Sequence, residues 1–154
     1  MLGSGAMTNS IEDVTRKAEV IMLVGRTPRR RTPSSAADTC GSRARLPAHR
    51  GRPRDIGLAA HADIHLKLRP GTNVAFANGI VNYLIQHELY DEDFVRERTE
   101  GFEILAATVR DYTPELVEDI CGIDRRDLVA AAKMYAAADA AAIMYCLGVT
   151  EHST

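Results

Sequence analysis

The stretch Ala62-Asp-Ile-His-Leu-Lys-Leu-Arg-Pro-Gly-Thr-Asn73 decides the fold of this chain. Apolar and polar residues alternate over 63–68, which predicts a short, half-buried strand. Pro70-Gly71 ends the strand, and Thr72 occupies the N-cap position of a helix whose apolar residues recur at helical spacing. A strand, a turn and a helix N-terminus in this order place backbone N–H groups at the carboxyl end of a sheet. Nucleotide-like ligands usually bind α/β proteins at that place.

Strands and helices alternate along the rest of the chain. The apolar run 19–25 closes with a glycine and predicts a strand buried on both faces, as in a parallel sheet. A second apolar run, 141–148, closes in the same way. This alternation predicts an α/β fold with parallel strands and several helices. Capping residues, acids and apolar spacing predict helices that begin near residues 11, 56, 91, 102, 113 and 124.

Composition sets broad limits. The 154 residues suit one domain, and 45% of them are hydrophobic, as in ordinary globular proteins. No apolar run approaches the roughly 18 residues of a membrane span, and the first residues lack the features of a signal peptide, so we expect a cytoplasmic protein without a membrane partner. Cys40, Cys121 and Cys146 are too few and too scattered to predict disulfides or a metal site.

Residues 26–52 differ from everything around them. This block holds eight arginines and one acid, a net charge of +7, although the whole chain carries -2. Its only large aliphatic residue is Leu46, so its composition predicts disorder. One interpretation is a basic arm for nucleic acid. No aromatic residue lies among the arginines to stack on bases, and we do not expect nucleic acid as a partner.

Seven motifs of this chain, in the order in which they occur, resemble a known protein family. Together they resemble the catalytic (alpha) subunit of molybdopterin-dependent formate dehydrogenases, within the molybdopterin oxidoreductase family. The resemblance covers residues 3–25 and 53–154. The motifs are Gly3–Ile11, the strand ending at Gly25, Ala62–Asn73, Leu89–Phe94, Arg98–Phe102, Tyr112–Glu115 and Leu147–Thr150.

The resemblance implies a partial dinucleotide-binding-like (Rossmann-like) domain made of residues 1–25 and 53–154. Such a domain binds one of two molybdopterin guanine dinucleotides, which carry molybdenum or tungsten. The family usually has glutamine where this chain has Glu151, which puts that contact in doubt. The cofactor-binding residues that the resemblance implies are Thr8, Asn9, Gly25, Gly71, Thr72, Asn73, Leu147, Gly148 and Thr150.

The implied activity of the intact enzyme is oxidation of formate to carbon dioxide, with electrons passed to an iron–sulfur cluster. In the family, the cluster cysteines and the metal ligand lie upstream of such a segment, and the active-site arginine lies downstream. No residue of this chain is therefore predicted to be catalytic or to bind the cluster, and we expect the isolated chain to be inactive. His61 and His65 have the spacing of helical metal ligands, but the strand pattern argues against a metal site.

The implied partners are the rest of the catalytic subunit and electron-transfer subunits. Two alternatives stay open. The first is another molybdopterin oxidoreductase, such as a nitrate reductase, because the residues that distinguish substrates are not in this segment. The second is a non-enzymatic α/β protein whose basic arm binds nucleic acid; such binding would weaken steeply with salt.

The block 26–52 has a further interpretation in this context. Permitted codons for Arg26 to Ala37, read from the third base, encode Asp-Thr-Thr-Glu-Lys-Asn-Pro-Ile-Val-Gly-Arg, which resembles the family's segment after the strand. Our hypothesis is an out-of-frame translation bounded by two compensating frameshifts. In that case the domain lacks a helix, a strand and an acid that would bind the guanosine ribose.

Overall fold

The structure is a computed structural model that describes residues 9–24, 47–50 and 62–145. The description below refers to these ranges. In chain order, the elements are α1 (Ile11–Lys17), β1 (Val20–Val24), β2 (Pro47–Arg50), β3 (Ile64–Lys67), α3 (Asn73–Gln86), α4 (Glu92–Arg98), α5 (Phe102–Val109), α6 (Pro114–Cys121), α7 (Arg125–Ala136) and β4 (Ala141–Tyr145).

Four strands form one parallel sheet in the order β3-β2-β1-β4. β1 pairs with β4 along its whole length, from Val20 opposite Ala141 to Val24 opposite Tyr145. The first four residues of β1 are buried, because a central strand of a parallel sheet is covered on both faces. The predicted α/β fold with parallel strands is confirmed for the described part of the chain.

Strand β2 lies inside the basic block 26–52, where no strand was predicted. It pairs in parallel with β1 through Leu23 opposite Ala48, and with β3 over its full length. Strand pairing joins main-chain groups and does not require apolar side chains, so the composition of the block did not reveal it. The expectation that the domain lacks a strand here is therefore wrong for Pro47–Arg50. The rest of the block, and the short helix predicted near residue 56, lie outside the described residues.

Four of the helices in the described ranges, α1, α4, α6 and α7, begin after a residue whose side chain caps them. The Ser10 hydroxyl accepts a hydrogen bond from the Asp13 N–H (3.1 Å) and donates one to the Asp13 carboxylate (2.6 Å). Thr113 caps α6 with its side chain, and a proline follows it as the first helical residue. Asp91 and Asp124 cap α4 and α7.

In the described ranges, none of these helices has the length and apolarity needed to cross a membrane.

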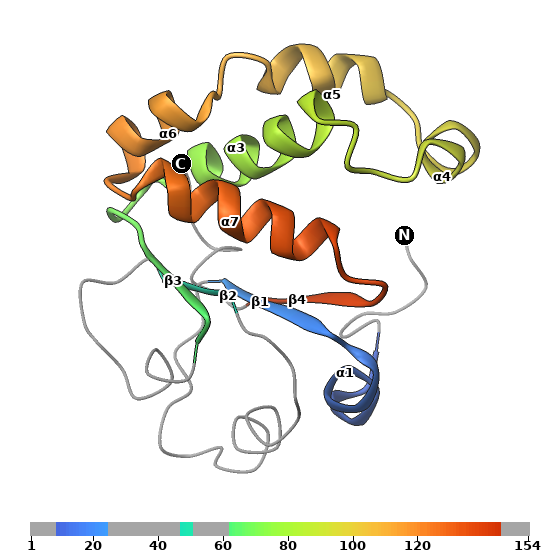
Figure 1. The fold of residues 1–154 in the computed structure, drawn as a ribbon. Coiled ribbons are helices and arrows are strands. Elements are labelled where there is room, and N and C mark those ends of the chain that lie inside the picture. Colours follow the sequence, from blue (N-terminus) through green and yellow to red (C-terminus); the bar gives the residue numbers. More distant parts are fainter. Residues whose placement is uncertain (1–8, 25–46, 51–61, 146–154) are drawn as a thin grey trace.

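One face of the sheet carries most of the helices. Helix α7 lies directly over the sheet with α3 beside it, α5 and α6 lie farther out, and α1 lies on the opposite face (Figure 1). The smaller core cluster joins Ile21 and Leu23 of β1 to Val14 and Ala18 at α1. The larger cluster joins β3 to the helices above it and contains Leu66, Leu68, Ala75, Phe76, Ile80, Tyr83, Val117, Cys121, Ile123, Leu128, Ala131 and Ala132.

Candidate functional site

The loop between β3 and α3 contains three of the predicted cofactor-binding residues in a row. It leaves the sheet at the carboxyl end of β3 and turns at Pro70-Gly71. Gly71 has φ +85°, a conformation that favours glycine, and no atom lies within 4 Å of the place that a Cβ would occupy. The structure therefore brings Gly71, Thr72 and Asn73 together at the carboxyl edge of the sheet, with open space beside the glycine.

The N-terminus of α3 has no side-chain cap. Thr72 occupies the N-cap position, as predicted, but its hydroxyl donates a hydrogen bond to the Arg69 carbonyl (2.8 Å) and does not accept one from the helix. The first turn also contains no acid. The first N–H groups of an α-helix have no partner within the helix and carry its positive dipole end. This start of a 14-residue helix therefore has the donors and the dipole that suit an anion.

The same loop is held from below by α6. The Arg69 N–H donates to the Cys121 carbonyl (2.9 Å), and the Cys121 thiol lies 3.6 Å from the Thr72 carbonyl, to which it donates. Burial raises the pKa of the Cys121 thiol, although its hydrogen bond to Thr72 and the charge of Arg69 act in the opposite direction. The thiol is therefore a protonated donor at neutral pH. This buried cysteine supports the loop and is not exposed to a ligand.

The other predicted positions do not belong to this loop. Val24 and Tyr145 end two paired strands at the same edge of the sheet as the end of β3. Asn9 is exposed directly before α1, which lies on the opposite face of the sheet from α3, so the structure does not bring it to the Gly71 loop (Figure 1). The remaining predicted residues, Thr8, Gly25, Leu147, Gly148 and Thr150, lie outside the described residues, as does Glu151.

In the described ranges, no group of three or more His, Cys, Asp or Glu side chains is placed to hold a metal ion. His65 lies in β3 opposite Ala48 of β2, so the strand predicted for this stretch is confirmed. His61 lies outside the described residues.

Sequence reasoning missed the part that α6 plays in this site. Arg69 and Cys121 are about fifty positions apart, and neither lies in a local pattern that predicts their contact. The one available signal is the glycine after α6, which predicts the end of that helix and hence carbonyl groups in need of donors.

Known proteins resemble this chain in both sequence and structure. The F420-dependent formate dehydrogenase subunit alpha of Methanocaldococcus jannaschii is 40% identical over 97% of this chain and 22% of its own length. Formate dehydrogenase H of Escherichia coli is 37% identical over 97% of this chain and 21% of its own length. In structure, the acetylene hydratase of Pelobacter acetylenicus matches 90% of this chain and 20% of its own with a TM-score of 0.80 and 28% identity.

No family model matches the chain. The chain spans about a fifth of the length of the relatives that it matches, since the matched shares of their lengths are 22% and 21%. Each of these two matches nevertheless extends over 97% of this chain, at 40% and 37% sequence identity. This chain belongs to the molybdopterin oxidoreductase family and corresponds to a segment of formate dehydrogenase alpha subunits.

Proposed function

We propose that this chain supplies part of the binding site for a molybdopterin guanine dinucleotide in a formate dehydrogenase subunit. The order of its strands carries the proposal. The order β3-β2-β1-β4 is that of the first four strands of doubly wound, Rossmann-like sheets, 3-2-1-4. In such sheets the ligand binds outside the carboxyl ends of the strands, at the point where the strand order reverses. Here that point lies between β1 and β4, and the loop after β3 lies at the same carboxyl edge beyond β2, so a dinucleotide would extend along this edge from one to the other.

The residues at this edge fit the chemistry of a dinucleotide. A pyrophosphate suits the uncapped start of α3, and the open space at Gly71 lets a ligand approach the backbone. An amide side chain such as that of Asn73 carries both donor and acceptor atoms, the types of group that hydroxyls and a base edge bind. Thr72 is more limited than predicted, because its hydroxyl hydrogen is already given to the Arg69 carbonyl and only its acceptor capacity remains.

In the intact enzyme the bound group would supply the redox chemistry at molybdenum or tungsten that oxidises formate to carbon dioxide. The residues of this chain would bind and orient it through its phosphates and its nucleoside, and none of them would touch formate. Gly25, Leu147, Gly148, Thr150, Thr8 and Asn9 remain proposed contacts from the motifs alone. We place the subunit in the cytoplasm, with its iron–sulfur cluster on another part of the subunit and with electron-transfer subunits as partners.

We keep the hypothesis that much of block 26–52 is an out-of-frame translation. The alignment with the Methanocaldococcus jannaschii subunit covers 97% of this chain, so block 26–52 lies within the aligned region. Sequencing the locus through codons 1–60 tests the hypothesis. Single-base slips near codons 26 and 52 are expected, and a clean frame would contradict it.

Binding of GDP to the purified 154-residue chain tests the proposed site, because GDP carries the guanosine and a pyrophosphate. We expect saturable binding of GDP by isothermal titration calorimetry and weaker binding of ADP. Gly71→Ala places a methyl group in the open space at the loop and should weaken GDP binding about tenfold or more.

Gly101→Ala is the matched control. Gly101 has φ +74° and equally open surroundings, so the backbone strain of the substitution is similar, but it begins α5 and not α3. The control should bind GDP within about twofold of the unsubstituted chain, a difference well under one kcal/mol. Equal losses in both variants, or no GDP binding by a folded chain, would contradict the proposal.

A further inference from the structure

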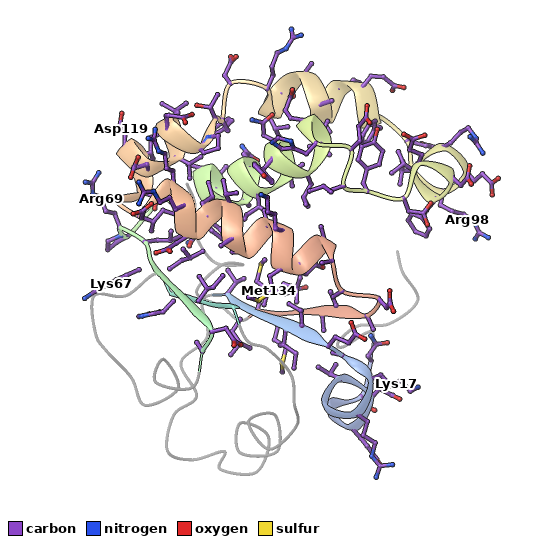
Figure 2. All side chains as sticks on the ribbon, in the orientation of Figure 1. Lys17, Lys67, Arg69, Arg98, Asp119 and Met134 are labelled. Atoms are coloured by element: carbon purple, nitrogen blue, oxygen red, sulfur yellow. The ribbon has the colours of Figure 1, made fainter. Side chains whose placement is uncertain are left out.

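We propose that Arg69 and Gly122, here named the latch, position the loop of residues 69–73 for phosphate binding. The inference rests on the proposed function, because it concerns the same loop. The latch itself is a set of contacts between the loop and the end of α6, far from the loop in sequence. Figure 2 shows Arg69 beside Asp119 at this place, with Lys67 directed away from it.

The first part of the latch is the Arg69 side chain. One guanidinium nitrogen, Nη1, donates to the Asp119 carbonyl (2.5 Å) and lies 3.4 Å from the Ile120 carbonyl. The Arg69 backbone N–H donates to the next carbonyl, that of Cys121. The last carbonyls of a helix have no partner within it and carry its negative dipole end. Arg69 therefore donates to three successive carbonyl groups at the end of α6, two through its side chain and one through its backbone N–H.

The second part is the glycine that ends α6. Gly122 has φ +69°, and its N–H donates to the Glu118 carbonyl (2.8 Å). A Cβ at this position would lie 2.8 Å from Nε and 3.1 Å from Cζ of Arg69. Glycine is thus required twice here, once for the backbone conformation and once to leave room for the guanidinium. The arginine and the glycine act as a pair.

The latch controls the loop because its contacts continue into it. The Arg69 carbonyl accepts the Thr72 hydroxyl (2.8 Å), and the Thr72 carbonyl accepts the Cys121 thiol and the Phe76 N–H (3.1 Å). The backbone from Arg69 to Thr72 is therefore fixed at both ends against α6. Preorganised donors bind an anion more tightly than mobile ones, because no ordering has to accompany binding. Arg69 is a positioning residue in this proposal, since its Nη1 and its backbone N–H donate to carbonyls of α6.

The test uses Arg69→Gln, Arg69→Lys and Gly122→Ala in the full chain, with GDP and guanosine as probes. If the latch positions the phosphate donors, Arg69→Gln and Gly122→Ala should weaken GDP binding about tenfold while guanosine binding changes less than about twofold. Arg69→Lys keeps the charge and one donor and should lose about threefold for GDP. A purely structural role would lower thermal stability without this difference between the two probes.

Arg125→Gln is the control variant. Arg125 is a half-exposed arginine at the start of α7 that pairs with Glu115 of α6 (3.4 Å), and within the described part of the chain it makes no hydrogen bond or ion pair with the loop of residues 69–73. It should bind both probes as the unsubstituted chain does. Equal weakening of GDP and guanosine by a folded Arg69→Gln variant, or unchanged GDP binding, would overturn the latch.

Hydrogen exchange distinguishes failure of the latch from failure of the proposed function. In the unsubstituted chain the N–H groups of Arg69 and Phe76 are hydrogen-bonded and should exchange slowly. In Arg69→Gln and Gly122→Ala they should exchange at least about tenfold faster, and in Arg125→Gln they should not. If the folded chain binds no GDP, the proposed function fails and this exchange pattern alone decides the latch. Unchanged protection at both positions would then overturn it.

Discussion

The loop of residues 69–73 and the segment from α4 to α5 are held in opposite ways. The loop is fixed by contacts to α6, about fifty positions away, and by the core beneath it. Helix α4 has no buried residue and is stabilised by its own Asp91 cap and by an ion pair between Asp93 and Arg96. Large apolar side chains stay exposed on this segment, with Phe94 at 59% and Ile104 at 74%.

The two regions therefore differ in how much of their surface is covered by other parts of the chain. The candidate site is built from contacts that are distant in sequence and lie within the described residues, whereas the α4–α5 segment leaves large apolar side chains such as Phe94 and Ile104 exposed. The chain spans only about a fifth of its relatives' length, 22% of the archaeal subunit. We therefore expect the core around the site to respond strongly to substitution and the α4–α5 segment to respond weakly.

The largest effect is expected from Leu128→Ala in α7. Leu128 is fully buried between the sheet and the helices, so truncation leaves a cavity and should lower the free energy of unfolding by about 2–5 kcal/mol. Ile104→Ala removes an isomeric but exposed side chain from α5 and should change the free energy of unfolding by no more than about 0.5 kcal/mol. Urea unfolding followed by circular dichroism measures both. Similar losses in the two variants would remove the contrast between the two regions.

A smaller effect is expected where α3 and α6 touch. A Cβ on Gly79 would lie 2.5 Å from Cγ2 of Val117, inside a closely packed contact. Alanine is usually favoured over glycine within a helix by about 1 kcal/mol, but this clash should reverse the sign and destabilise the chain by about 1–3 kcal/mol. The double variant Gly79→Ala with Val117→Ala should recover part of the loss, because the clashing methyl group is removed. Stabilisation by Gly79→Ala alone would show that the helices are free to separate.

The exposed segment should matter more for association than for stability. Phe94→Ser removes apolar surface from α4, where the side chain is 59% exposed, and should leave the free energy of unfolding within about 0.5 kcal/mol. It should also reduce self-association, measured by light scattering at increasing protein concentration. Glu97→Ser, at an exposed polar position of the same helix, is the control and should not reduce association. Unchanged self-association of the Phe94→Ser variant would show that this surface does not mediate self-association.

The sequence predicted the elements whose signals are local. Helices begin where they were predicted, near residues 11, 91, 113 and 124, and the structure shows Ser10, Asp91, Thr113 and Asp124 as their caps. The alternation over 63–68 correctly predicted a strand. Strand β2 could not be predicted, because its place depends on main-chain pairing with two neighbours and not on its own composition.

The candidate site could be predicted only in part, for the same reason. Gly71, Thr72 and Asn73 lie together because they are consecutive, which the sequence makes plain. The N-cap position of Thr72 was predicted correctly, but its hydroxyl donates to the nearby Arg69 carbonyl and does not cap the helix, which the sequence did not indicate. The contact of Arg69 with α6 spans about fifty residues and has no local signal.

The smallest expected effect concerns α1, a helix held by local contacts as α4 is. The hydrogen bond from the Ser10 hydroxyl lowers the pKa of the exposed Asp13 carboxyl below its ordinary value of 3.8, and Lys17, at 3.0 Å, lowers it further. A carboxyl whose pKa is lower in the folded state adds stability that is fully present above pH 3.8 and is lost as the pH falls through the folded pKa. The helicity of α1 should therefore be constant near neutral pH and decrease only in acid.

Ser10→Ala and Lys17→Met should each raise the pKa of Asp13 toward 3.8, because the Ser10 hydroxyl and the Lys17 ammonium both lower it. An NMR titration of the Asp13 carboxyl measures both shifts. A pKa that stays low in Ser10→Ala would mean that the start of α1 is not held by its cap. The short helices at the periphery would then need contacts beyond their own sequence, and the contrast with the loop of residues 69–73 would be one of degree.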